Sequence, residues 1–415
     1  MMILLKIALR SLISRSTIIF LTIISLSLSI LLYLSVDTLR LGAKKSFFGN
    51  VKSGDLILGS RSGEIQLLLY SLFQIGAPTN NISWESYKEI SKMPEIDWII
   101  PISLGDSHKQ FRVMGTNETY FDKFSYRKKK KLEFSSGQQF HDIFDVVIGS
   151  DVAKILNYKL EDSIIIAHGI SSQSLHDEFP FKIKGILKKT GTSVDRLVLV
   201  SLEALEVIHK DWKSGTRIPS IKTEQNKNIK YTDLEPKEIT AAVLKIKSPI
   251  NIFKIQREIN NFKYEALQAI IPGIALSKLW QIVSTTENIF LLISCFVIIT
   301  SLIGMVAILY STLSTRKREI SLLRITGASP LNIGFLMLIE AFLIAFMSII
   351  IAVIARYLIG LSLFPVLDNK YGVFIELKFL SYKDLLFLSL VLFTSIVVSI
   401  FPSRQAFKNS INDGM

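Results

Sequence analysis

The segment Asn288–Thr315, NIFLLISCFVIITSLIGMVAILYSTLST, decides the fold of this chain because its 28 consecutive residues carry no charged side chain. Glu287 precedes the segment and Arg316 follows it. An α-helix needs about 20 residues to cross the hydrocarbon core of a bilayer. The segment is therefore predicted to be a transmembrane helix, with enough length for tilt.

Other apolar runs lie toward both ends of the chain, whereas the middle has mixed polarity. The 415 residues are 49% hydrophobic with a mean hydropathy of +0.40, which is high for a soluble protein of this length. Transmembrane helices are predicted at residues 16–36, 288–315, 333–356 and 385–402. The predicted fold class is an α-helical integral membrane protein with four such helices in a one-plus-three arrangement. A large α+β extracytoplasmic domain of two lobes separates the first helix from the second.

Lysine and arginine set the predicted orientation, because they are enriched in the cytoplasmic flanks of transmembrane helices. Residues 1–15, 316–332 and 403–415 are basic flanks, whereas three lysines and three acidic residues balance in 357–384. We therefore expect both termini and the 316–332 link in the cytoplasm, and 37–287 and 357–384 outside. Residues 1–15 are predicted to form an amphipathic helix on the membrane surface or a frayed extension of the first span.

The 251 residues at 37–287 read as alternating short strands and helices. Strands are predicted at 55–58, 98–102, 146–148, 163–167, 181–186, 197–200 and 241–246. Helices are predicted at 84–93, 151–156, 202–209 and 251–260, with Ser83 and Ser201 as N-caps. Residues 38–105 and 238–287 are expected to form a membrane-proximal lobe, and 106–237 a distal lobe.

Patterns of catalytic and cofactor-binding residues are missing from the sequence. There is no Gly-Lys dipeptide, so a Walker A loop is absent and ATP hydrolysis would require a partner. Cys295 is the only cysteine and cannot form an intramolecular disulfide. The histidines have no metal-ligand spacing, so neither a metal nor a directly bound cofactor is predicted; they are His108, His141, His168, His176 and His209.

The excess of positive charge does not indicate nucleic acid. The net charge is +13, but several basic residues crowd the ends of the apolar runs, where positive charge sets membrane orientation. The run Arg127–Lys131 has five consecutive cations, which fits a solvated loop or contact with anionic lipid or a polyanionic surface. We leave these two interpretations open and predict no nucleic-acid partner.

Glu340 is an acidic residue within the third predicted span. At about 1.5 Å per helical residue it lies roughly 10 Å into the membrane, too deep to face lipid. A buried packing contact at a subunit interface is the preferred interpretation, ahead of a proton relay.

The link after the second span closely resembles the cytoplasmic segment of MacB/FtsX-type (type VII, LolCDE-like) ABC transporter permeases. It reads Ser314–Ser329, STRKREISLLRITGAS, in which a basic-Glu-Ile element precedes Leu-Arg and Gly-Ala. The one-plus-three arrangement, VIGSDVA at 147–153, FKIKGIL at 181–187 and the Pro-x-Arg-x-Ala pattern from Pro402 are similar to the family as well. Ser321 departs from the family, in which Gly is frequent.

This resemblance implies that the 316–332 link couples the chain to an ATPase. Ile320 and Leu323 share one helical face and Leu322 and Ile325 another, so full exposure of this helix to water would be unfavourable. The coupling residues implied are Arg316, Lys317, Arg318, Glu319, Ile320, Leu322, Leu323, Arg324, Gly327 and Ala328. A basic anchor at the membrane surface is the alternative.

The function implied is that of a permease subunit in the bacterial cytoplasmic (inner) membrane, not an enzyme. ATP and Mg²⁺ would be bound by a separate ABC ATPase dimer, whose closure would move the extracytoplasmic domains through mechanotransmission. A second permease subunit, identical or related, and a periplasmic or lipoprotein partner are expected. A lipoprotein or other amphiphile is the favoured substrate. Alternatives are a signalling permease that regulates a cell-wall hydrolase or sensor, and a motor-free membrane scaffold.

Overall fold

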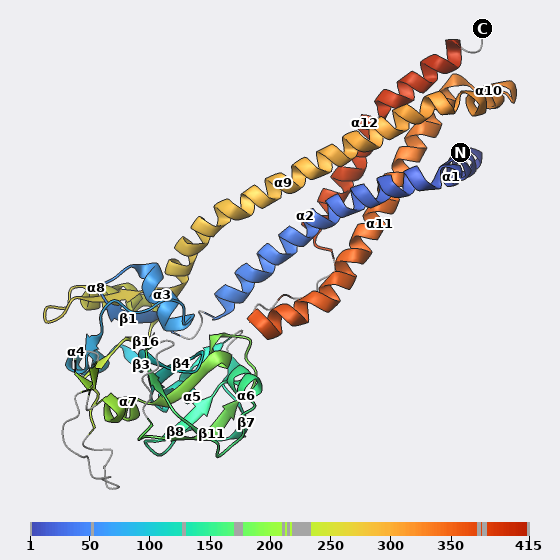
Figure 1. Ribbon diagram of the computed structural model, residues 1–415. Coiled ribbons are helices and arrows are strands. Elements are labelled where there is room, and N and C mark those ends of the chain that lie inside the picture. Colours follow the sequence, from blue (N-terminus) through green and yellow to red (C-terminus); the bar gives the residue numbers. More distant parts are fainter. Residues whose placement is uncertain are drawn as a thin grey trace. The chain divides into compact units, whose positions relative to one another are not determined.

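The computed structural model describes residues 2–50, 54–126, 130–169, 177–209, 212–213, 216–217, 234–371, 375 and 380–412. The chain divides into two compact units (Figure 1). One is a helical unit formed by Met1–Ala43, Val283–Leu367 and Ile375–Met415. The other is an α/β unit formed by Lys44–Ile282 and Asp368–Phe374.

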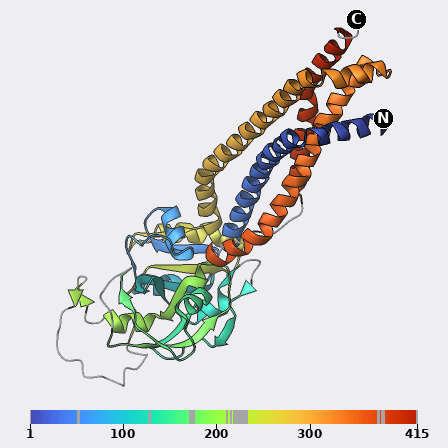
Figure 2. The same cartoon turned by 45° about the vertical axis from the view of Figure 1, so that its right-hand side comes forward.

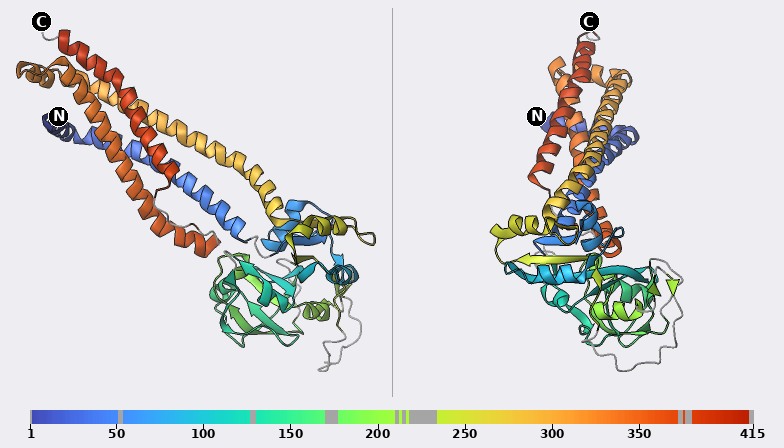
Figure 3. Two further views of the ribbon diagram at one scale, coloured as in Figure 1. Left: turned by 180° about the vertical axis from the view of Figure 1, so that it is seen from behind. Right: turned by 90° about the vertical axis from the view of Figure 1, so that its left-hand side faces the viewer.

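Long helices dominate the first unit, where α2, α9, α11 and α12 follow one general direction (Figures 1 and 3). Its helices are α1 (Met2–Ser14), most of α2 (Ser16–Asn50), most of α9 (Pro272–Thr315), α10 (Lys317–Ile325), most of α11 (Pro330–Tyr371) and α12 (Tyr382–Asn412). The parts of α2 after Ala43, of α9 before Val283 and of α11 after Leu367 belong to the other unit. Four stretches are long and apolar enough to cross a membrane: Ser16–Lys44, Pro272–Leu313, Pro330–Leu367 and Tyr382–Lys408. The predicted one-plus-three arrangement is confirmed.

These helices extend beyond the predicted spans. α9 has 44 residues and begins at Pro272. It includes Ser277–Glu287, where polar residues accompany the apolar ones, ahead of the predicted span at 288–315. The prediction counted the uncharged run, which measures the thickness of the hydrocarbon core and not the length of the helix.

Apolar side chains from α2, α9, α11 and α12 share one core. It includes Leu26, Leu34, Met305, Ile344 and Val391. Small residues allow close approach, since Ala341, Ala345 and Ala352 of α11 are fully buried. Large apolar residues such as Phe20, Phe290 and Phe393 are exposed on the outside of the helices. This distribution suits a lipid environment and not water.

A mixed sheet organises the α/β unit (Figure 2, light blue to yellow). Its main order is β17-β1-β16-β3-β4-β12-β8-β11-β7, in which β4–β12 and β8–β11 are parallel and the other neighbours antiparallel. The strands are β1 (Leu56–Ser60), β3 (Ile96–His108), β4 (Phe111–Thr116), β7 (Phe134–Gly137), β8 (Asp145–Ile148), β11 (Phe181–Leu187), β12 (Leu197–Ser201), β16 (Ala241–Ile246) and β17 (Leu267–Ile270). Off this path, β9 (Ser163–Ile164) pairs with β11, and β10 (Ala167–His168) pairs with β3.

Shorter elements complete this unit. Three small ladders pair β2 (Ile82–Ser83) with β15 (Glu238–Ile239), β5 (Ser125–Tyr126) with β6 (Lys130–Lys131), and β13 (Trp212–Lys213) with β14 (Thr216–Arg217). The helices are α3 (Glu64–Leu72), α4 (Trp84–Ser91), α5 (Thr119–Lys123), α6 (Ser150–Leu156), α7 (Leu202–His209) and α8 (Ile252–Asn260). The 3₁₀ turns Ser193–Arg196 and Pro249–Asn251 precede β12 and α8.

Most local predictions in this unit are confirmed. The helices predicted at 84–93, 151–156, 202–209 and 251–260 correspond to α4, α6, α7 and α8. Both predicted N-caps are present, because Ser83 Oγ accepts a hydrogen bond from the Ser86 amide and Ser201 Oγ accepts one from the Ala204 amide. The single strand predicted at 163–167 is wrong, since Ile165 and Ile166 separate β9 from β10.

Strand β3 joins the two halves of the sheet. Its first part, from Ile96 to Ile102, pairs with β16, and its second part, from Ser103 to His108, pairs with β4. The predicted boundary between the two lobes, at 105/106, falls inside this strand. The helices α7 and α6 adjoin the second half, where apolar residues of β4, β8, β11 and β12 form a buried cluster.

Candidate functional site

Backbone geometry separates α10, which holds most of the predicted coupling residues, from the helices on either side. Arg316 has φ −95° and ψ 2°, which interrupts the helix between Thr315 of α9 and Lys317 of α10. At the other end, Gly327 has φ +94°, a conformation that costs Gly far less than any other residue. The Ala328 amide donates to the Leu323 carbonyl at 2.9 Å, which closes the turn. The Gly-Ala pair thus ends α10 before α11 begins.

The two faces of α10 have different surroundings. Ile320 is 6% exposed and packs in a cluster with residues of α9, α11 and α12. Leu323 is partly buried against the core of the helical unit. Leu322 and Ile325 are 60% and 81% exposed on the other face, near the exposed Arg318. One face therefore holds the helix in place, and the other presents apolar surface.

A buried ion pair links the start of α10 to α11. Arg316 Nη1 donates to Glu340 Oε2 at 2.9 Å, and Arg316 Nη2 donates to Glu340 Oε1 at 2.8 Å. The side chains of Arg316 and Glu340 are 3% and 0% exposed. Two parallel hydrogen bonds fix both the position and the angle of the guanidinium. The Arg316 Nε also donates to Glu319 Oε2 at 3.2 Å.

Ser11 of α1 and Arg15, which lies between α1 and α2, also belong to this cluster. Ser11 Oγ accepts hydrogen bonds from Nη2 of Arg316 and Nη2 of Arg15, each at 2.6 Å. Arg15 Nη2 also lies 3.8 Å from Glu340 Oε1. We call Ser11, Arg15, Arg316 and Glu340 the buried charge cluster. It connects α1, the α9–α10 junction and α11 within one chain.

The coupling residues predicted from the sequence have different environments. Arg316 and Ile320 lie inside the helical unit, whereas Arg318, Glu319, Leu322 and Gly327 are exposed. Nη1 of the partly buried Arg324 donates to the Ala328 carbonyl at 3.2 Å, and Ala328 is itself partly buried. The side chain of Lys317 and residues 127–129 of the cationic run lie outside the described structure.

Glu340 is buried, and its partner is an arginine of the same chain. Its predicted place at a subunit interface stays a prediction. Sequence reasoning did not find Ser11 and Arg15, although the positive charge of Arg15 beside the first span was a signal available for it.

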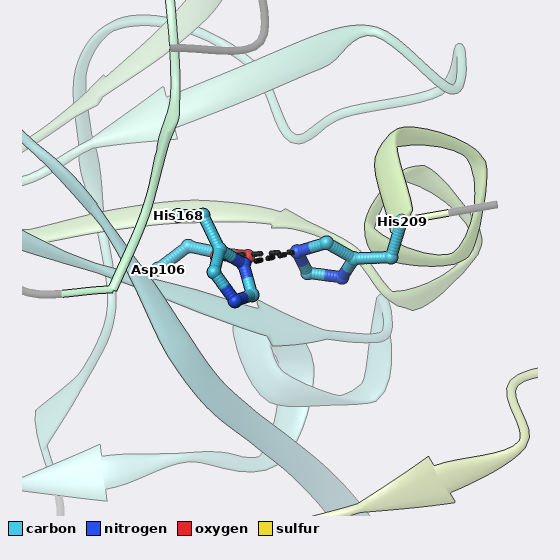
Figure 4. A group of neighbouring side chains, drawn as sticks. All are labelled: Asp106, His168 and His209. Carbon is cyan, nitrogen blue, oxygen red and sulfur yellow. Dashed lines mark hydrogen bonds and ion pairs between the residues drawn. The ribbon is translucent and has the colours of Figure 1, made fainter. Parts of the chain in front are cut away.

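The α/β unit contains a second polar cluster, formed by Asp106, His168 and His209 (Figure 4). Burial raises the pKa of Asp106, but hydrogen bonds with His168 and His209 outweigh it and bring that pKa to about 2. The hydrogen bond to Asp106 raises the pKa of His168 above its ordinary value. Linear spacing did not indicate this cluster, because folding brings its members together from β3, β10 and α7.

Two family models match the chain. The MacB-like periplasmic core domain matches residues 19–262, and the FtsX-like permease C-terminal domain matches residues 291–411. No curated protein matches.

Solved structures similar to this chain include an extracellular domain of the noncanonic ABC-type transporter YknZ from Gram-positive bacteria. That comparison has 15% identity and a TM-score of 0.31, and covers 52% of this chain and 98% of that one. The periplasmic region of MacB from Actinobacillus actinomycetemcomitans is also similar, at 12% identity and a TM-score of 0.35, with 56% of this chain and 97% of that one covered.

Proposed function

The chain belongs to the MacB/FtsX-type family of ABC transporter permeases, and we propose that it couples a separate ABC ATPase to movement of its extracytoplasmic domain. The movement would act on a lipoprotein or another amphiphile by mechanotransmission. In this proposal 37–287 and 357–384 lie outside the cytoplasmic membrane of a bacterium, and both termini lie inside. Two permease subunits, identical or related, would assemble with an ATPase dimer.

The exposed apolar face of α10 carries the proposal. Leu322 and Ile325 are exposed at one end of the helical unit, in a helix whose other face is anchored by Ile320. Apolar side chains on a charged cytoplasmic helix are unfavourable in water and favourable in a protein interface. Arg318 beside them would add electrostatic selectivity toward an acidic partner surface.

The buried charge cluster supports transmission of force from this helix. A displacement of α10 would reach α11 through Glu340 and α1 through Ser11, because Arg316 holds both residues by hydrogen bonds. α9 is continuous from Pro272, one residue after the end of β17, to Thr315 at the junction. One helix therefore joins the coupling segment covalently to the extracytoplasmic domain.

The docking surface is tested with Leu322→Asp and a matched control. Ile250→Asp makes the same kind of change at a residue that is 87% exposed in the extracytoplasmic domain. The two proteins are captured from native membranes, and co-purified ATPase is quantified by mass spectrometry. We expect Leu322→Asp to reduce ATPase recovery at least about tenfold, because a buried unpaired charge costs several kcal/mol in an interface, and Ile250→Asp to retain it.

Failure of the wild type to recover any ABC ATPase would support the motor-free scaffold. The substrate requires a separate assay, in which proteoliposomes containing the complex and an acylated lipoprotein are supplied with ATP. Release of the lipoprotein by the wild type and not by Leu322→Asp supports the amphiphile proposal. A complex that hydrolyses ATP without release would instead favour a signalling permease.

A further inference from the structure

We propose that Asp106, His168 and His209 form a binding site for one divalent transition-metal ion, with Zn²⁺ as the best-fitting ion. The site lies in the extracytoplasmic domain and is independent of the proposed coupling mechanism.

The fold places the three side chains together by specific local structure. β10 pairs antiparallel with β3, and this register sets His168 directly opposite Asp106. His209 is the last residue of α7, the helix that follows β12 after its N-cap at Ser201. Positive charge is favoured near the C-terminus of a helix, where carbonyl groups lack partners. A strand pair and a helix end thus direct three ligand groups to one point (Figure 4).

The distances among the three ligand atoms fit tetrahedral coordination. Asp106 Oδ1 lies 3.3 Å from His168 Nδ1 and 3.2 Å from His209 Nε2. The two imidazole nitrogens are 3.1 Å apart. Two ligands that are each about 2.0–2.1 Å from a tetrahedral Zn²⁺ lie about 3.3 Å from one another. The cluster therefore already has the edge lengths of one face of such a site.

The three contacts among Asp106 Oδ1, His168 Nδ1 and His209 Nε2 cannot all be good hydrogen bonds at once. If both imidazoles donate to Asp106 Oδ1, the 3.1 Å contact between their nitrogens joins two donors. If one imidazole donates its N–H to the other, the same N–H cannot also donate to Asp106. The three atoms are nearly equidistant, so from this nitrogen the directions to the other imidazole and to Asp106 differ by about 60°. An N–H that points at one acceptor is then poorly aligned with the other, and hydrogen bonds weaken steeply when the donor angle falls below about 120°. A cation at the centre would accept lone pairs from all three atoms. The ring planes cross at 83°, so both rings approach this point without stacking.

The chemistry of the ligand set selects the class of ion. Two imidazoles and one carboxylate are ligands of Zn²⁺ and related first-row metals, whereas Ca²⁺ and Mg²⁺ prefer oxygen ligands throughout. The side chain of Asp106 is 2% exposed, whereas those of His168 and His209 are 39% and 31% exposed. An ion can therefore reach the site from solvent and retain a water or an external ligand in its fourth position. Because its ligands come from β3, β10 and α7, the ion would cross-link these three elements and stabilise this part of the domain.

The test is a metal titration of the full-length protein in detergent, purified with a tag that contains no histidine. After removal of metals with a chelator, Zn²⁺ is titrated against a chromophoric competitor. We expect one tight site per chain, and at least about a tenfold loss of affinity in Asp106→Asn, His168→Gln and His209→Gln. His141→Gln is the matched control, since His141 is an exposed histidine outside the cluster, and it is expected to bind like the wild type.

A second measurement protects the test against variants that fold poorly. Co²⁺ bound to the wild type should give the visible absorption of a four-coordinate site, and added Zn²⁺ should abolish it by displacement. Absence of a tight site in the wild type, or unchanged affinity in a folded His168→Gln, His209→Gln double variant, would overturn the proposal.

Discussion

Glu340 in the helical unit and Asp106 in the extracytoplasmic domain are both deeply buried carboxylates, but their partners differ. Glu340 is held by Arg316, whose guanidinium is a permanent cation in proteins. Asp106 contacts two imidazoles, a side-chain type that commonly binds metals. The first arrangement is complete within the chain, whereas the second leaves a place for an exchangeable cation.

The largest effect on stability is expected from breaking the buried ion pair between Arg316 and Glu340. Arg316→Met leaves Glu340 buried without its bidentate partner and should lower the free energy of unfolding by about 3–5 kcal/mol. The double variant Arg316→Met, Glu340→Leu should lose less than Arg316→Met, because the fully buried carboxylate is removed together with its partner and only the partly exposed Arg15 loses a counter-ion. Unfolding is followed by circular dichroism in mild detergent.

Arg40→Met provides the control for this prediction. Arg40 pairs with Glu287 at 3.0 Å, but its side chain is about one third exposed, so its loss should cost less than about 1 kcal/mol. Equal costs for Arg316→Met and Arg40→Met would show that the buried charge cluster does not hold the helices together.

An intermediate effect on stability is expected from metal binding at the proposed site of Asp106, His168 and His209. Zn²⁺ at about 100 times its dissociation constant should raise the free energy of unfolding of the extracytoplasmic domain by about 2.7 kcal/mol. All four tryptophans, Trp84, Trp98, Trp212 and Trp280, belong to this unit, so their fluorescence reports its unfolding separately. His209→Gln should remove the zinc-dependent stabilisation. An equal zinc effect in this variant would place the ion elsewhere.

The smallest effect on stability is expected for Ser11, the neutral member of the buried charge cluster. Ser11→Ala removes the oxygen that accepts hydrogen bonds from Arg15 and Arg316 and should cost about 1–2 kcal/mol. Ser14→Ala alters an exposed serine of the same helix and should change stability by less than about 0.5 kcal/mol. The same unfolding measurement in detergent compares the two variants. A Ser11→Ala protein as stable as Ser14→Ala would restrict the cluster to its charged members.

The sequence predicted the membrane architecture well because lipid imposes a simple requirement on it. Uncharged runs such as 288–315 must be helices of membrane-spanning length, and the four predicted helices are present. Local signals also located α4 and α7, since each begins after a serine that caps it. Strand β4 at Phe111–Thr116 was missed, because RVMG interrupts any simple alternation and its pairing with β3 and β12 stabilises it.

The polar clusters were harder to predict because they depend on long-range contacts. Glu340 was recognised as buried, but its bond to Arg316 crosses 24 residues and its approach to Arg15 joins opposite ends of the chain. His168 and His209 are 41 residues apart, and His209 and Asp106 are 103 apart. Only the β3–β10 register and the end of α7 bring them together.

The most direct test measures amide hydrogen exchange in this permease mixed with its separately purified ATPase, with and without ATP. We predict that ATP changes exchange within residues 44–282 of the α/β unit in the wild type and in Ile250→Asp, but not in Leu322→Asp. Unchanged exchange in a wild-type complex that binds and hydrolyses ATP would contradict the proposal that α10 transmits movement across the membrane.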